Sequence, residues 1–415
     1  MTSSLASIPL PTAIVLMILT LGSIGLLVYW SVALVHAAGT LAGLPTAGSA
    51  LGRESPARHR VCMIVPAHNE ASNIGALVAS MRAQNDASAR FVLALDRCTD
   101  DTESIARAAI GDDDRFEIVL IDSCPPEWAG KVHAAWSGAS RSRAAADADL
   151  LVFSDADCSF HPECLRACAV LLDERRLDML SLLSTLSTRH WFEKVAQPAA
   201  TLELMRQYPL LRANHEGDRQ RPFANGQFMM FRASAYREIG GHEAVREALL
   251  EDIAFARLLA RAGLRTGLLL AGEAMSCRMY DTWGQFREGW KRIYIEAANR
   301  KSRRLVHASL VARSTGTALP LCGVLCLAMG LGIDGGWDPL RVAAIAFAGA
   351  GLLVWLAALL VAAKAGRSPL WAIVCHPIGS WLVGGILARA GKELARGVPT
   401  RWGGRQYVLK DRSQT

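Results

Sequence analysis

The chain has 415 residues, a formal net charge of +7 and a positive mean hydropathy. Its length leaves room for a large core and for more than one structural unit. Basic flanks of a membrane protein account for the charge, and no run of basic and aromatic residues resembles a nucleic-acid-binding module, which excludes a nucleic-acid partner. The 10 cysteines include no C-x-x-C pair, so there is neither a zinc signature nor a disulfide framework, and we expect a reduced, cytosolic central region.

An apolar, uncharged stretch over residues 10–36 lies near the start of the sequence. It is long enough to cross a bilayer as a helix, for which about 20 residues are needed. A signal peptide is the alternative, but the preceding tail has no Lys or Arg and the apolar run exceeds the usual length of such a signal. Arginines follow at positions 53, 58 and 60, and the positive-inside rule then places the large middle region in the cytosol. We predict a transmembrane helix within residues 1–38 and a linker over residues 39–57.

Strand-like and helix-like patterns alternate between residues 60 and 160. Apolar runs predict strands over residues 61–65, 91–95, 116–121 and 150–154, with helices between them over residues 71–82, 102–110 and 131–146. This alternation implies a Rossmann-like α/β fold with a parallel sheet and right-handed crossovers. Ligands bind beyond the carboxyl ends of such strands, which is where polar turns follow the apolar runs.

The most informative of these turns is Asp155-Ala156-Asp157, directly after the fourth run. Side chains two residues apart in an extended segment point the same way, so both carboxylates can converge on one cation. Their hard oxygen atoms suit Mg²⁺ or Mn²⁺, and a diphosphate could complete the coordination. The alternative is a solvated turn without a ligand.

Three further turns suggest a nucleotide site. Pro66-Ala67-His68-Asn69-Glu70 leads from the first strand into a helix, whose backbone amides, with Asn69 and Glu70, suit the base and ribose of a nucleotide. Asp96, after the second strand, could accept a hydrogen bond from a uracil N–H, and Lys131, at a helix start, could meet a phosphate. Each turn could instead be a simple helix cap. Together with residues 155–157 they predict a site for a nucleotide and a metal.

The later part of the chain adds a second set of motifs and the membrane segments. Asn225-Gly226-Gln227 enters a further strand, and Glu251-Asp252 opens a helix. A basic amphipathic helix is predicted over residues 283–306, where it would lie on an anionic leaflet. Apolar segments follow within residues 307–390, and a basic tail covers residues 391–415. Three complete spans would put that tail outside, so we expect the last segment, broken at His376-Pro377, to be re-entrant or interfacial.

In their order along the chain, these motifs resemble those of the membrane-bound family 2 glycosyltransferases, which have the A-type glycosyltransferase fold. The resemblance places the cytosolic transferase domain at residues 58–282. It implies a UDP-sugar donor, a divalent metal and inversion at the anomeric carbon. It makes Asp252 the general base, and it assigns the metal and the diphosphate to Asp155 and Asp157. The donor-binding residues that it implies are Pro66, His68, Asn69, Glu70, Asp96, Lys131 and Asp155.

Two stretches bear on the acceptor. The family's Gln-x-x-Arg-Trp motif is imperfect in Gln285-Phe286-Arg287-Glu288-Gly289-Trp290, which has two residues between Arg and Trp, and a helix on the membrane surface is the alternative interpretation. Arg401-Trp402-Gly403-Gly404-Arg405-Gln406-Tyr407 resembles an element of the lipid-glycosylating members, namely the carotenoid, hopene-associated and ceramide types. Residues assigned to the acceptor or the diphosphate are Asn225, Gln227, Glu251, Gln285, Arg287, Trp290 and Arg292.

We therefore expect a multi-pass protein of the inner cell membrane that transfers one sugar to a lipid at the cytosolic leaflet. A processive polysaccharide synthase is the second possibility, and the imperfect Gln-x-x-Arg-Trp motif argues against it. The third is an inactive scaffold that only binds nucleotide, and the retained Asp155, Asp157 and Asp252 argue against that.

Overall fold

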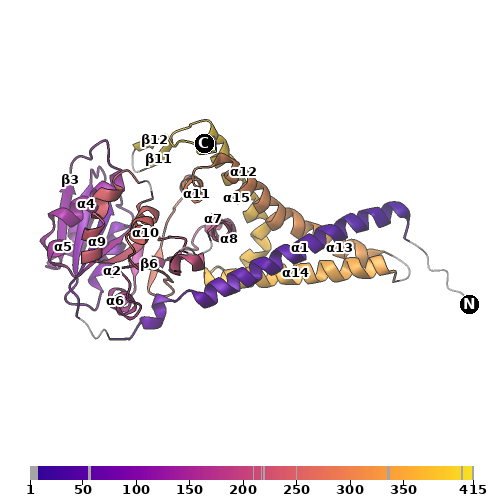
Figure 1. Cartoon of the computed structure of the whole chain (residues 1–415), viewed down its shortest axis with the longest axis horizontal. Helices are drawn as coiled ribbons and strands as arrows, with labels where there is room; N and C mark the ends of the chain where they lie inside the picture. Colours follow the sequence, from indigo (N-terminus) through magenta and orange to yellow (C-terminus); the bar gives the residue numbers. More distant parts are fainter. Residues whose placement is uncertain are drawn as a thin grey trace, which may run out of the picture.

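The computed structural model describes residues 8–54, 58–208, 210–215, 217, 220–248, 250–333, 337–402 and 405–413. The molecule consists of an α/β domain and a set of long helices (Figure 1). Helix α1 (Leu10–Gly43) starts at the far end of the long helices and leads to the α/β domain, after which the chain returns to the helices. The C-terminal segment lies beside the α/β domain.

Seven strands form the central sheet, in the order β3-β2-β1-β4-β8-β6-β9. All neighbours pair in parallel except β8, which is antiparallel to both β4 and β6. The four predicted strands over residues 60–160 and their parallel pairing are confirmed, and the complete sheet is mixed because β8 is antiparallel. The strands are β1 (Val61–Ala67), β2 (Arg90–Asp96), β3 (Phe116–Ile121), β4 (Leu150–Ser154), β6 (Met179–Leu183), β8 (Phe228–Arg232) and β9 (Thr266–Leu270).

The direction of β8 matters for the site. Because β8 runs opposite to β4, it begins at the edge of the sheet where β4 ends, and Phe228 pairs with Ser154. The turn at residues 225–227 is thereby brought to the carboxyl ends of the parallel strands, next to residues 155–157.

Helices cover both faces of the sheet. Met63 and Val65 of β1 lie in one buried cluster, and Cys62 and Ile64 lie in the other, which explains why β1 reads as an unbroken apolar run. Packing is close at Gly138, where a Cβ would lie 2.8 Å from Cγ2 of Ile64. The first layer contains α2 (Ile74–Arg82), α3 (Thr102–Ile110) and α6 (Cys164–Glu174); the second contains α4 (Gly130–Arg141), α5 (Arg143–Asp147), α9 (Ala233–Glu238) and α10 (Glu251–Arg261).

A small sheet with the strand order β5-β10-β7 lies at the end of β4. It pairs Cys158 of β5 with Cys277 of β10. Since β5 follows Asp157 directly, this sheet fixes the turn after β4. Its strands are β5 (Cys158–Phe160), β7 (Thr185–Leu186) and β10 (Met275–Cys277), and α7 (Trp191–Val195) and α8 (Gln197–Gln207) follow β7.

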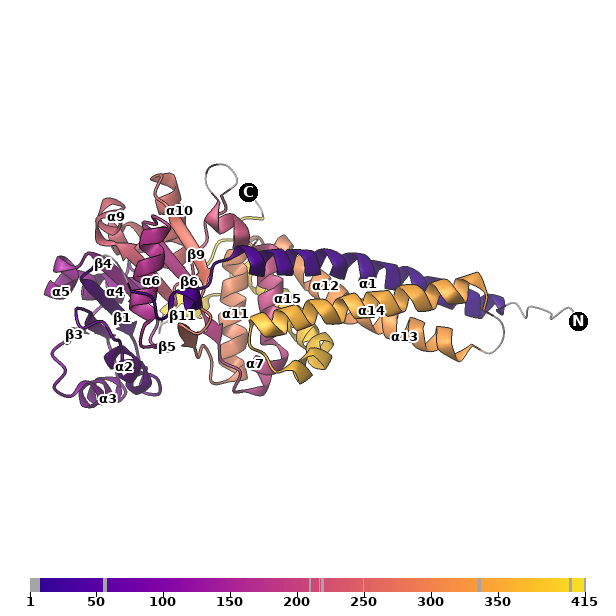
Figure 2. The same ribbon diagram turned by 90° about the horizontal axis from the view of Figure 1, so that it is seen from below.

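Four helices of the described chain are long and apolar enough to cross a membrane: Leu10–Gly43, Ser302–Gly332, Pro339–Ala365 and Leu370–Ala395. Helix α1 runs beside α13 (Leu319–Gly332) and α14 (Pro339–Ala365) (Figure 2). It continues to Gly43, five residues beyond the predicted end of the span, and Pro45 follows directly after its C-cap Leu44.

The predicted helix over residues 283–306 is divided into two. Helix α11 (Trp283–Ala297) ends before Asn299 and Arg300, which have φ angles of 55° and 54°, and α12 (Ser302–Arg313) follows. Two successive left-handed residues cannot continue a right-handed helix, so the chain changes direction at this point. The segment after α12 is continuous with α13 through a π-helical turn, Ser314–Ala318.

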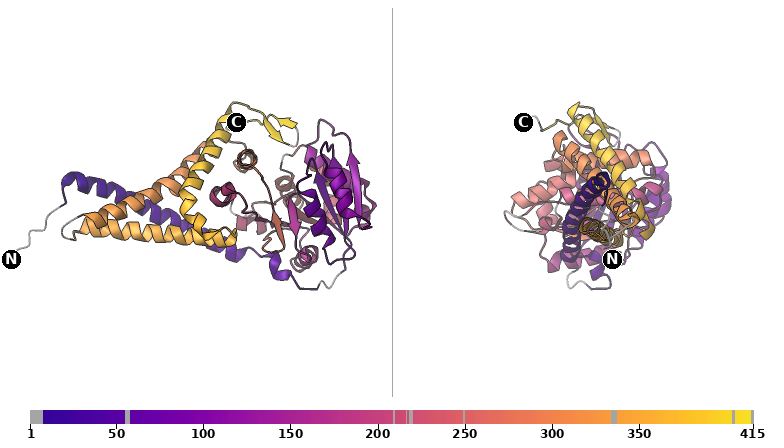
Figure 3. Two further views of the ribbon diagram at one scale, coloured as in Figure 1. Left: turned by 180° about the vertical axis from the view of Figure 1, so that it is seen from behind. Right: turned by 90° about the vertical axis from the view of Figure 1, so that its right-hand side faces the viewer.

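Helix α15 (His376–Ala395) contacts the α/β side of the molecule at both of its ends. Gly379 packs so closely against the Val195 carbonyl of α7 that a Cβ there would clash. At the other end, Nζ of Lys291 donates to Glu393 over 2.7 Å. Figure 3 shows α15 running back toward the C-terminal end beside α12. The basic tail therefore lies on the same side of the molecule as the α/β domain, and the interfacial placement of this segment stays a prediction.

Candidate active site

Lys131 connects two of the predicted motifs. Its Nζ lies 2.6 Å from Oδ1 of Asp155, after β4, and 2.6 Å from Oε1 of Glu251, at the start of α10. Burial opposes a charge on Lys131, but the two carboxylates outweigh it and raise the pKa of the ammonium. Burial also opposes the ionisation of Glu251, yet Lys131 holds the pKa of this carboxyl below its ordinary value. Lys131 thus stays protonated between the end of β4 and the start of α10.

Asp252 lies beside this ion pair on the first turn of α10. Its Oδ2 accepts the N–H of Gly226 over 2.8 Å, and its Oδ1 accepts the N–H of Ile253 over 2.7 Å. Burial and the neighbouring Glu251 raise the pKa of Asp252 to about 7. The carboxylate is held in one orientation and gains or loses its proton near neutral pH.

Position 226 has no room for a side chain, so it requires glycine. A Cβ at this position would lie 3.1 Å from Oε1 of Glu251, 3.2 Å from Nζ of Lys131 and 3.3 Å from Oδ2 of Asp252. Any side chain on this turn would therefore press on all three charged groups, so glycine lets the backbone approach the acids.

Asp157 is reached through a chain of hydrogen bonds from the same turn. Nδ2 of Asn225 donates to Oε1 of Gln227 over 3.0 Å, and Nε2 of Gln227 lies 3.0 Å from Sγ of Cys277. The Cys277 thiol donates to Oδ1 of Asp157 over 3.3 Å. Burial, with repulsion from Asp155, raises the pKa of Asp157 to about 7. Asn225 and Gln227 thus act on Asp157 through Cys277.

The turns after β1 and β2 are tied to each other. Nδ1 of His68 lies 2.6 Å from the carbonyl oxygen of Asp96. The N–H of Thr99 donates to Oδ1 of Asn69 over 2.8 Å, which Asn69 permits by its left-handed φ of 57°. Pro66 is the penultimate residue of β1 and pairs with Ala94 of β2. The predicted donor-binding residues of these two turns are therefore held next to one another.

The carboxylate of Asp96 is buried and held by its neighbour. Nε of Arg97 donates to Oδ1 over 2.8 Å, and a terminal nitrogen of the same guanidinium donates to Oδ2 over 2.6 Å. Glu70, on the next turn, accepts from Nδ2 of Asn73 over 2.8 Å, and burial raises its pKa.

Helix α11 brings one of its four predicted residues to the site. Burial lowers the pKa of Arg292, and its guanidinium is attracted by Tyr280 and by the carboxylates of Glu251, Asp155 and Asp252. It therefore lies among the charges of the site. Lys291 of the same helix is also buried but pairs with Glu393, so the tertiary packing decides which cation of α11 reaches the site.

The other three predicted residues of α11 have local roles. Gln285 caps the helix, because its Oε1 accepts the N–H of Thr282 over 3.1 Å. Arg287 lies over the ring of Trp283, 5.7 Å from its centroid. Trp290 is buried next to Tyr294, with 5.5 Å between the ring centroids.

Tyr280 and two cysteines on neighbouring strands, Cys158 and Cys277, are parts of the site that the sequence analysis did not identify. The Tyr280 ring lies against Gly289 of α11, where a Cβ would clash with it, and burial raises the pKa of its phenol. No motif marks Tyr280. For Cys158, the position directly after Asp157 was an available signal, whereas Cys277 is far away in sequence.

Comparison with protein families identifies the domain. The model described as "Glycosyltransferase like family 2" matches residues 58–303, which is more than half of the chain. The chain belongs to glycosyltransferase family 2. It is thus an enzyme that transfers a sugar from a nucleotide sugar, and its α/β domain, with the mixed sheet, is of the A-type glycosyltransferase kind.

Solved structures of glycosyltransferases are similar to the chain at low identity. A mannosyltransferase from Pyrobaculum calidifontis, in complex with GDP-Man and Mn²⁺, is 16% identical, with a TM-score of 0.47; the match covers 92% of this chain and 99% of that one. A glucosyl-3-phosphoglycerate synthase from Mycobacterium tuberculosis, in complex with Mn²⁺, UDP-glucose and phosphoglyceric acid, is 17% identical, with a TM-score of 0.39; the match covers 61% and 87% of the two chains. No curated protein matches the chain.

The acidic residues after β4 fit a divalent metal in this glycosyltransferase. Burial raises the pKa of both Asp155 and Asp157, and a cation between them would favour their ionised forms. In the described part of the chain each carboxylate uses Oδ1 for its protein partners, Lys131 for Asp155 and the thiols of Cys158 and Cys277 for Asp157, and no hydrogen bond engages either Oδ2. Hard carboxylate oxygens are the ligands that Mg²⁺ and Mn²⁺ prefer.

Proposed function

We propose that this glycosyltransferase is an inverting enzyme that moves one sugar from a UDP-sugar to a membrane lipid at the cytosolic leaflet. The observation that carries the proposal is the environment of Asp252. This carboxyl is buried, has a pKa of about 7, and adjoins the ion pair that links α10 to the end of β4.

Inversion requires a base that takes the proton of the acceptor hydroxyl while its oxygen attacks the anomeric carbon. The N–H groups of Gly226 and Ile253 fix the orientation of the Asp252 carboxylate, and each oxygen retains a further lone pair for the acceptor. A pKa near 7 makes the carboxylate a stronger base than an exposed one while leaving it ionised for a large part of the time at neutral pH.

The donor is proposed to lie along the carboxyl ends of the strands. Asp96, His68, Asn69 and Glu70 would surround the uridine, and Asp155 and Asp157 would hold the metal. When bound, a divalent metal supplies compensation for the negative charge that develops on the departing diphosphate. Lys131 and Arg292 place two more cations among these acids, where they would attract the same group.

The membrane helices support a lipid acceptor and a cytosolic site. Lys301, Arg303 and Arg304 lie where the chain leaves the α/β side for a candidate span, and the basic tail returns to that side. The positive-inside rule assigns such a side to the cytosol. The resemblance of residues 401–407 to lipid-glycosylating members also favours a lipid; Gly403 and Gly404 lie outside the described residues, while β11 (Thr400–Trp402) pairs with β12 (Arg405–Tyr407).

The test uses the full-length enzyme in nanodiscs that contain lipid extract from the producing cells. UDP-sugars and GDP-sugars with a labelled sugar are supplied with Mn²⁺, and the products are resolved by thin-layer chromatography and mass spectrometry. The expected result is one labelled lipid that carries one sugar from a UDP donor, absent with Asp252→Asn and retained with the exposed-residue control Glu247→Gln. A long polymer, or transfer only from a GDP-sugar, would overturn the proposal, as would no transfer from any donor.

A further inference from the structure

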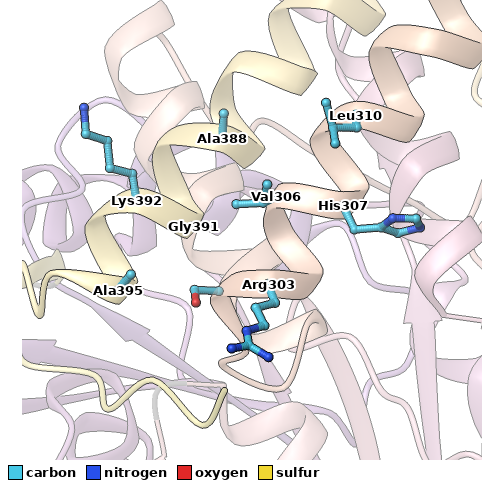
Figure 4. Close-up of a pocket in the computed structure, with 9 residues that line it drawn as sticks. Arg303, Val306, His307, Leu310, Ala388, Gly391, Lys392 and Ala395 are labelled. Carbon is cyan, nitrogen blue, oxygen red and sulfur yellow. The ribbon is translucent and has the colours of Figure 1, made fainter. Parts of the chain in front are cut away.

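A shallow groove runs between α12 and α15 (Figure 4). Its volume is about 430 Å³. Two helices alone form its walls, so it is open along one side of the molecule. The lining residues are Ser302, Arg303, Val306, His307 and Leu310 of α12, and Ala388, Gly391, Lys392 and Ala395 of α15.

The floor of the groove is apolar. The helices approach closely at Gly391, where a Cβ would lie 3.1 Å from Cγ2 of Val306 and 3.2 Å from the carbonyl oxygen of Ser302. Val306 is 48% exposed and Leu310 is 61% exposed, although both are large apolar side chains. In a membrane protein, such exposed side chains on a candidate span are solvated by acyl chains.

Basic residues border this apolar seam. Figure 4 shows His307 and Lys392 extending outward from the two opposite helices, with Arg303 at the end of the groove. Among the described residues, no ion pair engages Arg303 or Lys392. The nearby carboxylate of Glu393 is already bound by Lys291 and Arg389. In the described part of the chain, the groove therefore presents two cations without an ion-pair partner around an apolar floor, with the Asp411 carboxylate at the Ser302 N–H beside its end.

The charges lie at the level where lipid headgroups are expected. Arg303 is in the first turn of the candidate span Ser302–Gly332, and Lys392 is in the last turn of α15, which ends on the α/β side. Leu310 is seven residues beyond Arg303, which is about 10 Å deeper along the helix. At the deeper end, the guanidinium of Arg313 lies 4.6 Å from the ring centroid of Trp381, which closes this side of the seam.

We propose that the groove between α12 and α15 binds an anionic glycerophospholipid of the bilayer. Its phosphate lies beside Arg303 at the end of the groove, with Lys392 on the facing helix, and an acyl chain lies along Val306, Leu310 and Ala388. Charge complementarity selects an anionic headgroup, because each basic residue near a membrane surface contributes about 1 kcal/mol to its attraction. The residues of the groove lie outside the catalytic set, and binding of this lipid does not depend on the proposed acceptor.

Native mass spectrometry of the full-length protein tests the proposal without donor or turnover. Delipidated protein in mild detergent is titrated with phosphatidylglycerol, with phosphatidylcholine, and with glycerol phosphate as a soluble headgroup. The double variant Arg303→Gln/Lys392→Gln is expected to weaken phosphatidylglycerol binding about 30-fold, from the loss of two cations. Val306→Trp, which fills the floor, is expected to abolish binding while all cations remain.

Arg304→Gln is the matched control, because Arg304 is exposed on the same turn of α12 and lies outside the groove. It should bind within twofold of the wild type, as should Arg303→Lys/Lys392→Arg, which also shows that loss in the neutral variant is not misfolding. Equal binding by all variants, an equal loss with Arg304→Gln, or equal affinity for phosphatidylcholine would overturn the proposal. A dimer that Val306→Trp disperses would overturn it too, because a second copy would then occupy the groove.

Discussion

The backbone N–H of Gly226 donates a hydrogen bond of 2.8 Å to Oδ2 of Asp252. This contact joins a turn before β8 to the first turn of α10, 26 residues later. It exists because β8 is antiparallel to β4 and starts at the edge of the sheet where the acidic residues lie. The same turn approaches Lys131 and Glu251, so one stretch of backbone aligns the groups on which we base the chemistry.

Asp252→Asn removes the proposed base and keeps the shape of the side chain. We expect kcat to fall by roughly 100- to 10,000-fold, as is typical for the loss of general-base catalysis. The Kd for UDP should change less than threefold, because Asp252 is not among the proposed donor contacts. Transfer assays and calorimetry measure the two quantities, and wild-type turnover in this variant would contradict the base assignment. Glu247→Gln, an exposed change close in sequence, is the control.

The pH profile should show the ionisation of Asp252. Burial and Glu251 raise its pKa to about 7, and a general base works only when it is deprotonated. The value of kcat/KM should therefore fall about tenfold per pH unit below pH 7, and it should level off above that pH. Initial rates with saturating Mn²⁺ across this range provide the measurement. A profile that stays flat down to pH 5 would show that the base has an ordinary carboxyl pKa.

Gly226→Ala should damage activity far more than stability. The added Cβ lies 3.1–3.3 Å from Glu251, Lys131 and Asp252, so these groups must shift by a few tenths of an ångström. A misplacement of about 1 Å in a catalytic site can cost on the order of 100-fold in rate, so we expect a smaller but clear loss of rate for these shifts. Gly75→Ala in α2 is the control, since its Cβ would meet only Cγ2 of Ile105 at 3.5 Å. Rates and thermal unfolding separate the two effects; equal activity in both variants would contradict this prediction.

Asp155→Ala should remove the metal dependence of donor binding. We expect Mn²⁺ to strengthen UDP binding to the wild type by at least roughly tenfold, through the metal held between Asp155 and Asp157. The variant should bind UDP with the same Kd in the presence and absence of Mn²⁺. The wild type should lose its Mn²⁺-dependent gain in UDP affinity when a chelator removes the metal. Calorimetry provides the values. Asp149→Asn, at the other end of β4 and paired with Arg60, should behave as the wild type, and a full Mn²⁺ response in Asp155→Ala would exclude this metal site.

Much of the fold was predictable because its signals are local. The strands over residues 61–65, 91–95 and 150–154 are buried on both faces. A strand that is buried on both faces consists of consecutive apolar residues, which can be recognised in the sequence. Asp155 and Asp157 directly follow such a strand, and Glu251 and Asp252 form the start of α10. Candidate membrane-spanning helices can also be recognised in the sequence, because crossing a bilayer requires a long stretch of uncharged, apolar residues.

The tertiary structure decided which of these residues meet. Local patterns do not encode the direction of β8, because a short apolar strand reads the same in a parallel and in an antiparallel sheet. The contacts of Lys131 with Glu251 and of Cys277 with Asp157 join residues 120 positions apart, so only the packed sheet brings them together. Among the residues of α11, the packing turned Arg292 toward the acids and left Gln285 as a helix cap. The sequence by itself determined the elements and the chemical groups of this enzyme, whereas long-range packing, which depends on the whole chain, determined their alignment.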